Sequence, residues 1–175
     1  MMSTLISILS AFGYISAVIG AIFLLIAFAK KMLYYPPIVK EKVSDKLSKN
    51  FYVAGALITI SLTCFSGGKQ LIKSDFKNSL QNNKIISAEV NGIFFSQDDL
   101  KGIFNNFQDT EGRYRCDHFT GVINFEHNES IPVEIIRHCY EKNRYIIISK
   151  KYDMDTDIGD IRTSKFDYLQ KDTIK

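Results

Sequence analysis

Two long runs without a charged side chain lie near the start of this chain, and they constrain its fold more than any other feature. The first covers residues 4–29 and the second residues 51–65. A helix that spans a bilayer needs about 20 apolar residues, because lipid offers no hydrogen-bond partner to the backbone. The first run exceeds this length, and the second approaches it when flanking polar residues sit in the headgroup layer. The sequence therefore predicts two transmembrane helices, at about 4–29 and 51–66, joined as a hairpin by the basic loop 30–50.

Each run has an alternative interpretation. Ala27-Phe28-Ala29 is similar to the cleavage site of a signal peptide, but residues 1–3 lack the basic side chain that such a leader carries. The second run is short enough to be the core helix of a soluble domain, yet residues 54–60 show no polar face. A helix that is apolar on all sides is buried in protein or in lipid, so we expect both runs to be membrane spans.

The loop between the two runs is strongly basic. Its net charge over residues 30–50 is +4, because only Glu41 and Asp45 oppose six lysines, which are Lys30, Lys31, Lys40, Lys42, Lys46 and Lys49. The positive-inside tendency places such a loop in the cytoplasm. We therefore expect a bacterial inner-membrane protein with both termini extracytoplasmic and with these lysines in contact with anionic lipid headgroups. Lys69, Lys73 and Lys77 weaken the contrast, since they follow the second run closely.

Small residues recur at fourfold spacing in both runs. Gly13, Ala17 and Ala21 form one such stripe, and Gly55 begins the other. Small residues let helix backbones approach closely in lipid, so we expect these positions to pack the two spans against each other, with homodimerisation as the alternative. Neither run contains an ionisable residue, which argues against a transporter or pump that acts alone.

Residues 69–175 have the composition of one small soluble domain. They contain 16 Lys and Arg against 17 Asp and Glu, a net charge of −1, so the whole-chain charge of +3 comes from the loop. A nearly neutral domain lacks the basic surface of a nucleic-acid-binding protein. Its length suffices for one core and is too short for two. We therefore predict a transmembrane hairpin at 1–68 and a soluble extracytoplasmic domain at 69–175, with no nucleic acid as a partner.

Local patterns predict that this domain is α+β. Asn91-Gly92 separates two apolar runs and supplies the two positive φ angles that a tight hairpin turn requires. Ser96 followed by Asp99 is typical of a helix start of the capping-box kind. The predicted elements are a helix at 69–81, strands at 85–90 and 93–95, a helix at 97–107, and strands at 119–126, 131–135 and 145–148. After the first helix the order is β-β-α-β-β-β, typical of a small antiparallel sheet with one packed helix.

Two cysteines of this domain are candidates for a disulfide. Cys116 and Cys139 lie in the part expected outside the cytoplasm, where a bridge is chemically allowed. Matching the apolar faces of the two neighbouring strands pairs Ile123 with Val133, which leaves the cysteines one residue out of register. A bulge or an early strand end would remove this mismatch, so the bridged and the free state both stay open. Cys64, in the second apolar run, is most simply a packing residue.

Two groups of side chains invite a metal interpretation. The candidate zinc ligands are Cys116, His118, His138 and Cys139. Their spacing matches no common zinc motif, and they do not all share one strand face. The residues similar to a calcium loop are Asp153, Asp155, Asp157 and Gly159. The glycine of this loop is one place late, and Ser164 stands where a bidentate Glu belongs, so we expect neither a metal nor a cofactor.

The tail of the chain carries one family resemblance. Residues 158–163 read Ile-Gly-Asp-Ile-Arg-Thr, and Phe166 follows. This pattern resembles the C-terminal Ile-Gly-x-Ile-x-Thr-x-x-Phe tail of a set of small, uncharacterised bacterial membrane-anchored proteins. Those proteins have short anchors and then a small sheet domain, and the resemblance implies no activity. From the residues themselves, Gly159 would permit a tight turn, while Ile158, Ile161 and Phe166 would dock the tail on the sheet.

The sequence contains no Gly-rich phosphate loop and no Gly-x-Ser-x-Gly nucleophile elbow, so we expect a protein without enzymatic activity. Our first hypothesis is that the outward domain binds another protein, as an immunity protein against a secreted toxin or as an accessory subunit of a membrane complex. A second is a sensor that binds a small ligand in an apolar pocket between helix 97–107 and the sheet and signals through the hairpin. A third is a membrane-tethered hydrolase, which would need Cys116 or Cys139 reduced and close to a histidine.

Overall fold

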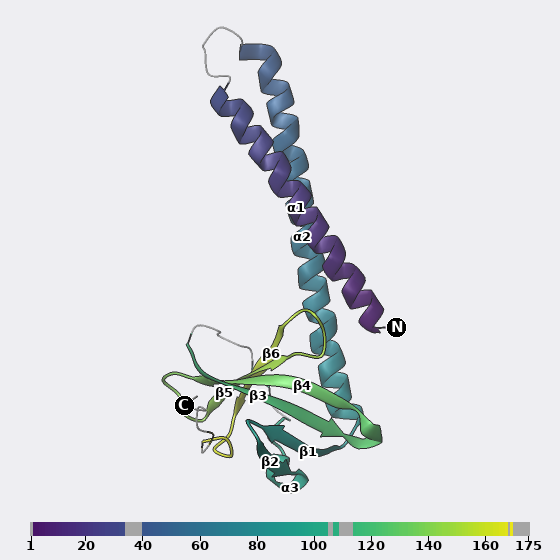
Figure 1. The fold of residues 1–175 in the computed structure, drawn as a ribbon, viewed down its shortest axis with the longest axis vertical. Coiled ribbons are helices and arrows are strands. Elements are labelled where there is room, and N and C mark those ends of the chain that lie inside the picture. Colours follow the sequence, from purple (N-terminus) through teal and green to yellow (C-terminus); the bar gives the residue numbers. More distant parts are fainter. Residues whose placement is uncertain (1, 34–39, 105–106, 109–113, 168, 170–175) are drawn as a thin grey trace. The chain divides into compact units, whose positions relative to one another are not determined.

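The structure is a computed structural model, and it describes residues 2–33, 40–104, 107–108, 114–167 and 169 (Figure 1). The side chains at 33, 40–48 and 127 lie outside this description. By its internal contacts the chain divides into two units, Met1–Lys69 and Gln70–Lys175. We call the first the helix pair and the second the sheet domain. The boundary falls inside a single long helix, α2.

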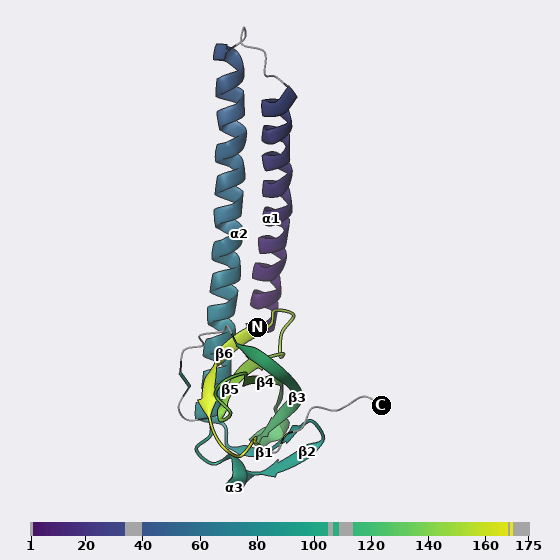
Figure 2. The same cartoon turned by 90° about the vertical axis from the view of Figure 1, so that its left-hand side faces the viewer.

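The helix pair consists of α1 (Met2–Leu33) and the first part of α2 (Lys40–Asn82), which lie side by side and antiparallel (Figures 1 and 2). The Tyr14 ring meets the Phe65 ring edge-on, with 4.9 Å between centroids. At the other end of the contact, Phe28 meets Phe51 at 5.8 Å. Both helices are long and apolar enough to cross a membrane, by length and composition.

The face between the two helices is built from small side chains. Those buried in the pair include Ser10, Gly13, Ser16, Gly20, Ala27, Ala54 and Ser61. A Cβ added at Gly13 would come within 3.2 Å of the Phe65 ring, so glycine allows this close approach. Large apolar side chains point the other way, and Phe12 and Leu25 are 62% and 66% exposed.

The predicted packing stripe differs from this observed face. Gly13 is buried and Ala17 is half-buried, whereas Ala21 and Gly55 are exposed. A Cβ added at Gly55 would meet nothing within 4 Å. A step of four residues turns about 40° beyond one full helical turn, so a strict fourfold stripe drifts away from a partner helix. The observed contact instead combines steps of three and four residues, as helices that pack along their length require.

The sheet domain contains six antiparallel strands, and the α+β class is confirmed. The strands are β1 (Ile85–Val90), β2 (Ile93–Ser96), β3 (Arg115–Phe125), β4 (Ser130–His138), β5 (Arg144–Ser149) and β6 (Thr156–Arg162). Their spatial order is β2-β1-β3-β4-β5-β6, and Figure 2 shows that the sheet is strongly curled. The β1–β2 turn is the predicted Asn91-Gly92, and both residues have positive φ angles, 51° and 75°.

Apolar side chains are buried on both faces of the sheet: Ile136, Ile146 and Ile148 form a cluster on one face, and a larger layer lies on the other. Phe119 on β3 pairs with Ile135 on β4, which pairs with Ile147 on β5, and all three side chains are completely buried. Burying each of them contributes about 1.5–3 kcal/mol. Tyr145 and Phe166 complete this layer, and their rings meet edge-on at 5.5 Å.

The last turns of α2 pack against the sheet domain, where the sequence predicts a helix at 69–81. Ile72 and Phe76 are each 1% exposed, and Phe76 meets Phe107 edge-on. Asp75, on the next face, accepts hydrogen bonds from the Lys151 ammonium at 3.0 Å and the Tyr152 hydroxyl at 2.7 Å. The segment after β5 is thereby fastened to α2 by an ion pair and a hydrogen bond.

The helix predicted at 97–107 is much shorter in the structure. Only α3 (Gln97–Leu100) is helical, and turns follow through Phe104. The chain changes direction at Gly102, whose φ of 81° a right-handed helix cannot contain. Leu100 and Phe104 are nevertheless buried, so the apolar spacing marked core residues correctly even though the backbone is not one helix.

The segment predicted as a docked tail is a strand. β6 pairs with β5 along its length, and Gln108 and Asp160 exchange two backbone hydrogen bonds of 2.9 Å on the outer side of β6. Gly159 is required here for close approach, because a Cβ would lie 2.8 Å from the Gln108 carbonyl oxygen. The predicted tight turn at Gly159 is therefore wrong. Ile158 and Ile161 are buried within the strand.

The predicted register between β3 and β4 is wrong by two residues. Ile123 lies opposite Ile131 and not Val133. The connection is a short loop through the 3₁₀ turn Glu126–Asn128, closed by a 2.8 Å hydrogen bond from the Phe125 N–H to the Glu129 carbonyl. Asn128 makes this tight loop possible with a φ of 59°, a conformation that asparagine tolerates better than most residues.

Candidate functional site

A disulfide joins β3 to the segment that follows β4. Cys116 and Cys139 are bridged, with their Cα atoms 5.1 Å apart. The β3–β4 pairing shifts between Arg115 and His118, so the irregularity falls at Cys116. The Cys139 N–H also donates to the Tyr114 carbonyl at 3.0 Å. A bulge thus removes the mismatch of one residue that an uninterrupted register would leave between the two cysteines.

Beside this disulfide lies a group of three rings, Tyr114, His138 and Tyr140, which we call the aromatic cluster. The two tyrosine rings meet edge-on with 4.9 Å between centroids, and the Tyr114 and His138 rings lie 5.6 Å apart. His138 is 8% exposed, while Tyr114 is 48% and Tyr140 77% exposed. A buried imidazole therefore supports two tyrosine rings that face solvent.

Hydrogen bonds from its backbone N–H groups to the His138 ring hold the loop that carries Tyr140. His138 Nδ1 accepts the N–H of Tyr140 at 3.4 Å and the N–H of Glu141 at 3.1 Å. An Nδ1 that accepts leaves the proton of a neutral ring on Nε2. Together with the bridge at Cys139, these bonds fix three successive residues of the loop and so the position of the Tyr140 ring.

Charged side chains brace the same loop from the other end. The Arg144 guanidinium, itself buried, donates to Glu141 at 2.8 Å and to Asp160 on β6 at 2.6 Å. The second Glu141 oxygen pairs with Arg162 at 2.7 Å. Hydrogen bonding to Arg144 lowers the pKa of Glu141, so this carboxylate stays ionised. The hydrogen bond from Arg144 to Glu141, with the one to Asp160, raises the pKa of Arg144 against the effect of its burial.

The exposed tyrosine rings of the aromatic cluster have properties that are common in protein interfaces. Tyrosine offers a large apolar ring with a polar hydroxyl, and such rings dominate the binding energy of many protein interfaces. A side chain that is already held in place loses little conformational entropy when a partner binds. Tyr114 and Tyr140 combine exposure with a fixed position, which is the combination that favours recognition.

The metal and hydrolase hypotheses find little support in this geometry. Among the described residues there is no group of three or more His, Cys, Asp or Glu side chains that could hold a metal ion. His118 pairs with Glu134 at 2.6 Å, and both sulfurs of Cys116 and Cys139 are tied in the disulfide. Neither sulfur is therefore free to act as a nucleophile in this state.

The acidic residues that are similar to a calcium loop pair with cations of the protein. Asp155 contacts Lys150 and Asp157 contacts Arg115, each at 2.5 Å. A carboxylate that neutralises a neighbouring cation is not available as a dedicated metal ligand without breaking that pair. This segment therefore serves to connect β5 and β6.

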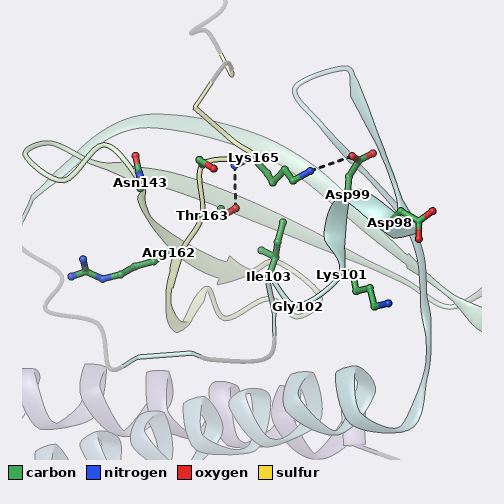
Figure 3. Close-up of a pocket in the computed structure, with 10 residues that line it drawn as sticks. Asp98, Asp99, Lys101, Gly102, Ile103, Asn143, Arg162, Thr163 and Lys165 are labelled. Atoms are coloured by element: carbon green, nitrogen blue, oxygen red, sulfur yellow. Dashed lines mark hydrogen bonds and ion pairs between the residues drawn. The ribbon is translucent and has the colours of Figure 1, made fainter.

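A pocket does lie beside residues 98–103, but it is polar (Figure 3). It has a volume of about 620 Å³ and opens widely to solvent. Figure 3 shows Lys165 reaching across it toward Asp99, with 3.7 Å between nitrogen and oxygen. The Ser96 hydroxyl and N–H lower the pKa of the Asp99 carboxyl through hydrogen bonds. The small-ligand hypothesis predicts an apolar pocket at this place, and Ile103 is the main apolar side chain that lines the observed one.

The predicted membrane-surface lysines fall into two groups. Lys30 and Lys31 are exposed in the last turn of α1, and Lys49 is exposed within α2. The side chains of Lys40, Lys42 and Lys46 lie outside the described residues. α2 begins at Lys40, so the backbone from this residue onward is already helical.

The C-terminal segment is fastened to the core by Arg137. Its guanidinium donates to the carbonyl oxygens of Phe166, Asp167 and Leu169, at 3.3, 3.3 and 2.8 Å. It also lies over the Phe119 ring, 5.3 Å from the centroid. Burial, with a hydrogen bond to Asp167, raises the pKa of Tyr145 to about 12, although Arg137 acts in the opposite direction.

The aromatic cluster is the feature that the sequence analysis missed. Tyr114 lies two residues before Cys116, and Tyr140 directly follows Cys139. Their adjacency to the two cysteines was a usable signal, because a bridge between the cysteines brings both tyrosines to one place. No protein-family model matches this chain, and the searches of curated proteins and of solved structures found no match.

Proposed function

We propose that this chain is a membrane-anchored protein without enzymatic activity, whose sheet domain binds another protein outside the cytoplasm. The observation that carries the proposal is the aromatic cluster. Tyr140 is exposed on a loop fixed by a disulfide and by Arg144, and the exposed Tyr114, directly before β3, packs against the Tyr140 ring. Interfaces concentrate their binding energy in a few such rings. The role fits an immunity-like protein or an accessory subunit of a membrane complex.

The helix pair supports the membrane anchor beyond its length and composition. Its interior holds glycine, alanine and serine, while phenylalanine, leucine and isoleucine face outward. Such an arrangement would be costly in water, because the large side chains stay exposed to the solvent. In lipid it is favourable, because apolar side chains face the acyl chains and small residues allow close helix packing. We therefore propose two membrane spans within α1 and α2.

Two observations support a sheet domain on the extracytoplasmic side. Residues 30–50, between the two proposed spans, carry a net charge of +4, which favours the cytoplasm for this segment. The Cys116–Cys139 bridge favours an oxidising compartment for the domain that follows α2. In a bacterium this combination corresponds to the inner membrane, with both termini on the periplasmic or outer side.

The proposal can be tested by crosslinking in living cells. A photoreactive amino acid placed at Tyr140 should form one discrete crosslinked product of higher mass, because this ring would lie inside the interface. The matched control is the same amino acid at Phe94, which is 69% exposed on β2, away from the aromatic cluster. In the Tyr114→Ala background the Tyr140 product should weaken by about tenfold, the effect of losing a contact worth about 1.4 kcal/mol.

Identification of the product by mass spectrometry decides the outcome. A product specific to position 140 that contains a second protein supports the proposal. The same products at positions 140 and 94, or none at position 140, would contradict it.

A further inference from the structure

A second polar pocket lies along α2 within the sheet domain. Its wall on the helix side comprises residues between Gln70 and Gln81, and its other wall is formed by Phe107, Gln108 and Ile158. Its volume is about 400 Å³, within the range of small-molecule sites. The proposed protein-binding surface lies elsewhere in the domain and uses none of these residues.

The described residues of this pocket carry unbalanced charge. Lys73 and Lys77 are among its described lining residues, and none of those residues is a carboxylate. Within the described part of the chain neither ammonium group takes part in an ion pair or a side-chain hydrogen bond, whereas Lys151 pairs with both Asp75 and Glu129. Asp75 stands between the two lysines in sequence, but its carboxylate is occupied by Lys151.

An anion bound between the two ammonium groups would relieve the repulsion between them. Lysines four residues apart on a helix lie on the same face and repel each other. Hydrogen-bond donors surround them, because Gln70, Asn78 and Gln81 are also in the lining. The apolar side chains of Phe107 and Ile158 on the opposite wall limit solvent there and so strengthen attraction between a bound anion and the ammonium groups.

We propose that this pocket binds a phosphate ester through Lys73 and Lys77. A phosphate group carries several acceptor oxygens, which match two ammonium groups and neighbouring amides. The volume leaves room for an organic group attached to the phosphate. Two sources share this chemistry, namely the headgroup of an anionic phospholipid and a soluble phosphate ester.

The lipid source rests on the proposed function. Gln70 lies four residues beyond the predicted end of the second span at about residue 66, where a helix leaving a bilayer passes through the headgroup layer. The same proposal gives a reason for Lys73 and Lys77 on a side of the membrane where the positive-inside tendency expects few lysines.

The test uses the full-length protein and two arms. In the lipid arm, native mass spectrometry of the detergent-solubilised protein compares phosphatidylglycerol with phosphatidylcholine. In the soluble arm, isothermal titration calorimetry follows binding of glycerol 3-phosphate. The variant is Lys73→Gln with Lys77→Gln, and the matched control is Lys84→Gln with Lys142→Gln, two exposed lysines outside the pocket.

We expect the pocket variant to lose about tenfold or more in affinity in one arm, since hydrogen bonds to charged groups are the strong ones. The control should change by less than about twofold. Loss confined to phosphatidylglycerol identifies a lipid headgroup site, and loss confined to glycerol 3-phosphate identifies a soluble ester site. Equal binding by both variants, or no binding in either arm, overturns the proposal. Crosslinking at Tyr140 does not involve these lysines. Failure of the protein-binding proposal can therefore be distinguished from failure of the phosphate-binding proposal.

Discussion

In the helix pair the side chains that face inward are mostly glycine, alanine and serine, whereas in the sheet domain they are phenylalanine, tyrosine and isoleucine. Large apolar side chains that are exposed are distributed in the opposite way. Among the described residues, eighteen large exposed apolar side chains lie in the helix pair and five in the sheet domain. One chain therefore contains two parts that obey opposite rules of burial, as parts adapted to lipid and to water do.

The difference shows which interactions hold each part together. The sheet domain depends on the hydrophobic effect, because folding removes its large side chains from water. In the membrane setting that we propose, the helix pair would gain little from that effect and would depend instead on close contact between backbones. Tyr114 and Tyr140 are among the few large apolar side chains of the sheet domain that are exposed. For this reason we propose that they contact a binding partner.

The largest expected effect comes from shortening a buried side chain of the sheet domain. Phe119→Ala should lower the free energy of unfolding of this domain by about 3–5 kcal/mol, through lost burial and a remaining cavity. Urea unfolding of the full-length protein in detergent, followed by near-ultraviolet circular dichroism, measures the change. The matched control is Phe12→Ala on the outside of α1, which should leave the unfolding transition unchanged. Equal shifts for both variants would contradict the difference in burial between the two parts.

A charge on the outer surface of the helix pair should have the next largest effect. Val18 is 59% exposed near the middle of α1, so Val18→Lys would place an ammonium group in the acyl region. The cost is about 2.5–3.5 kcal/mol at the centre of a span. We expect less protein in the membrane fraction after alkaline carbonate washing, whereas Phe94→Lys on the sheet domain should leave this amount unchanged. An unaltered yield for Val18→Lys would argue that α1 faces water.

The smallest perturbation is a chemical label, and it sharpens the comparison by locating the sheet domain. In a Cys64→Ala background a membrane-impermeant maleimide should label intact cells only after reduction, at Cys116 and Cys139. The reason is that the bridge masks both thiols in an extracytoplasmic domain. The number of labels on each chain is measured from the shift in its mobility on a gel. Labelling before reduction would contradict the bridge, and labelling only after lysis would place the domain in the cytoplasm.

Features with a strong local cause were predictable from the sequence. Asn91-Gly92 dictates its turn through backbone angles that few other residues accept, and the structure has a hairpin there. The strands β1 to β5 follow from apolar alternation or from apolar runs. The position of α1 follows from the first uncharged run, whereas α2 extends at both ends well beyond the second run.

Features set by contacts distant in sequence were not predictable. Gly159 and Asp160 interrupt the apolar pattern of β6, and only the approach of Gln108 explains why a glycine stands there. Gly102 ends α3, although Leu100 and Phe104 keep helical spacing. The aromatic cluster forms because a disulfide joins Cys116 to Cys139, and that disulfide needs the bulge in β3. A bulge has no clear signature in a single sequence.

The hold of Arg137 on the last described residues has a consequence for the order of synthesis. Phe166 packs against Phe95 and Tyr145, and three carbonyl oxygens of this segment accept hydrogen bonds from Arg137. A growing chain presents Arg137 and the Phe95 ring long before it presents Phe166. Until Phe166 and Leu169 leave the ribosome, the six strands enclose an unfinished apolar surface and a guanidinium without these carbonyl partners. The sheet domain therefore completes its fold only after Leu169 is made, and a chain that stops before Phe166 would keep that surface open.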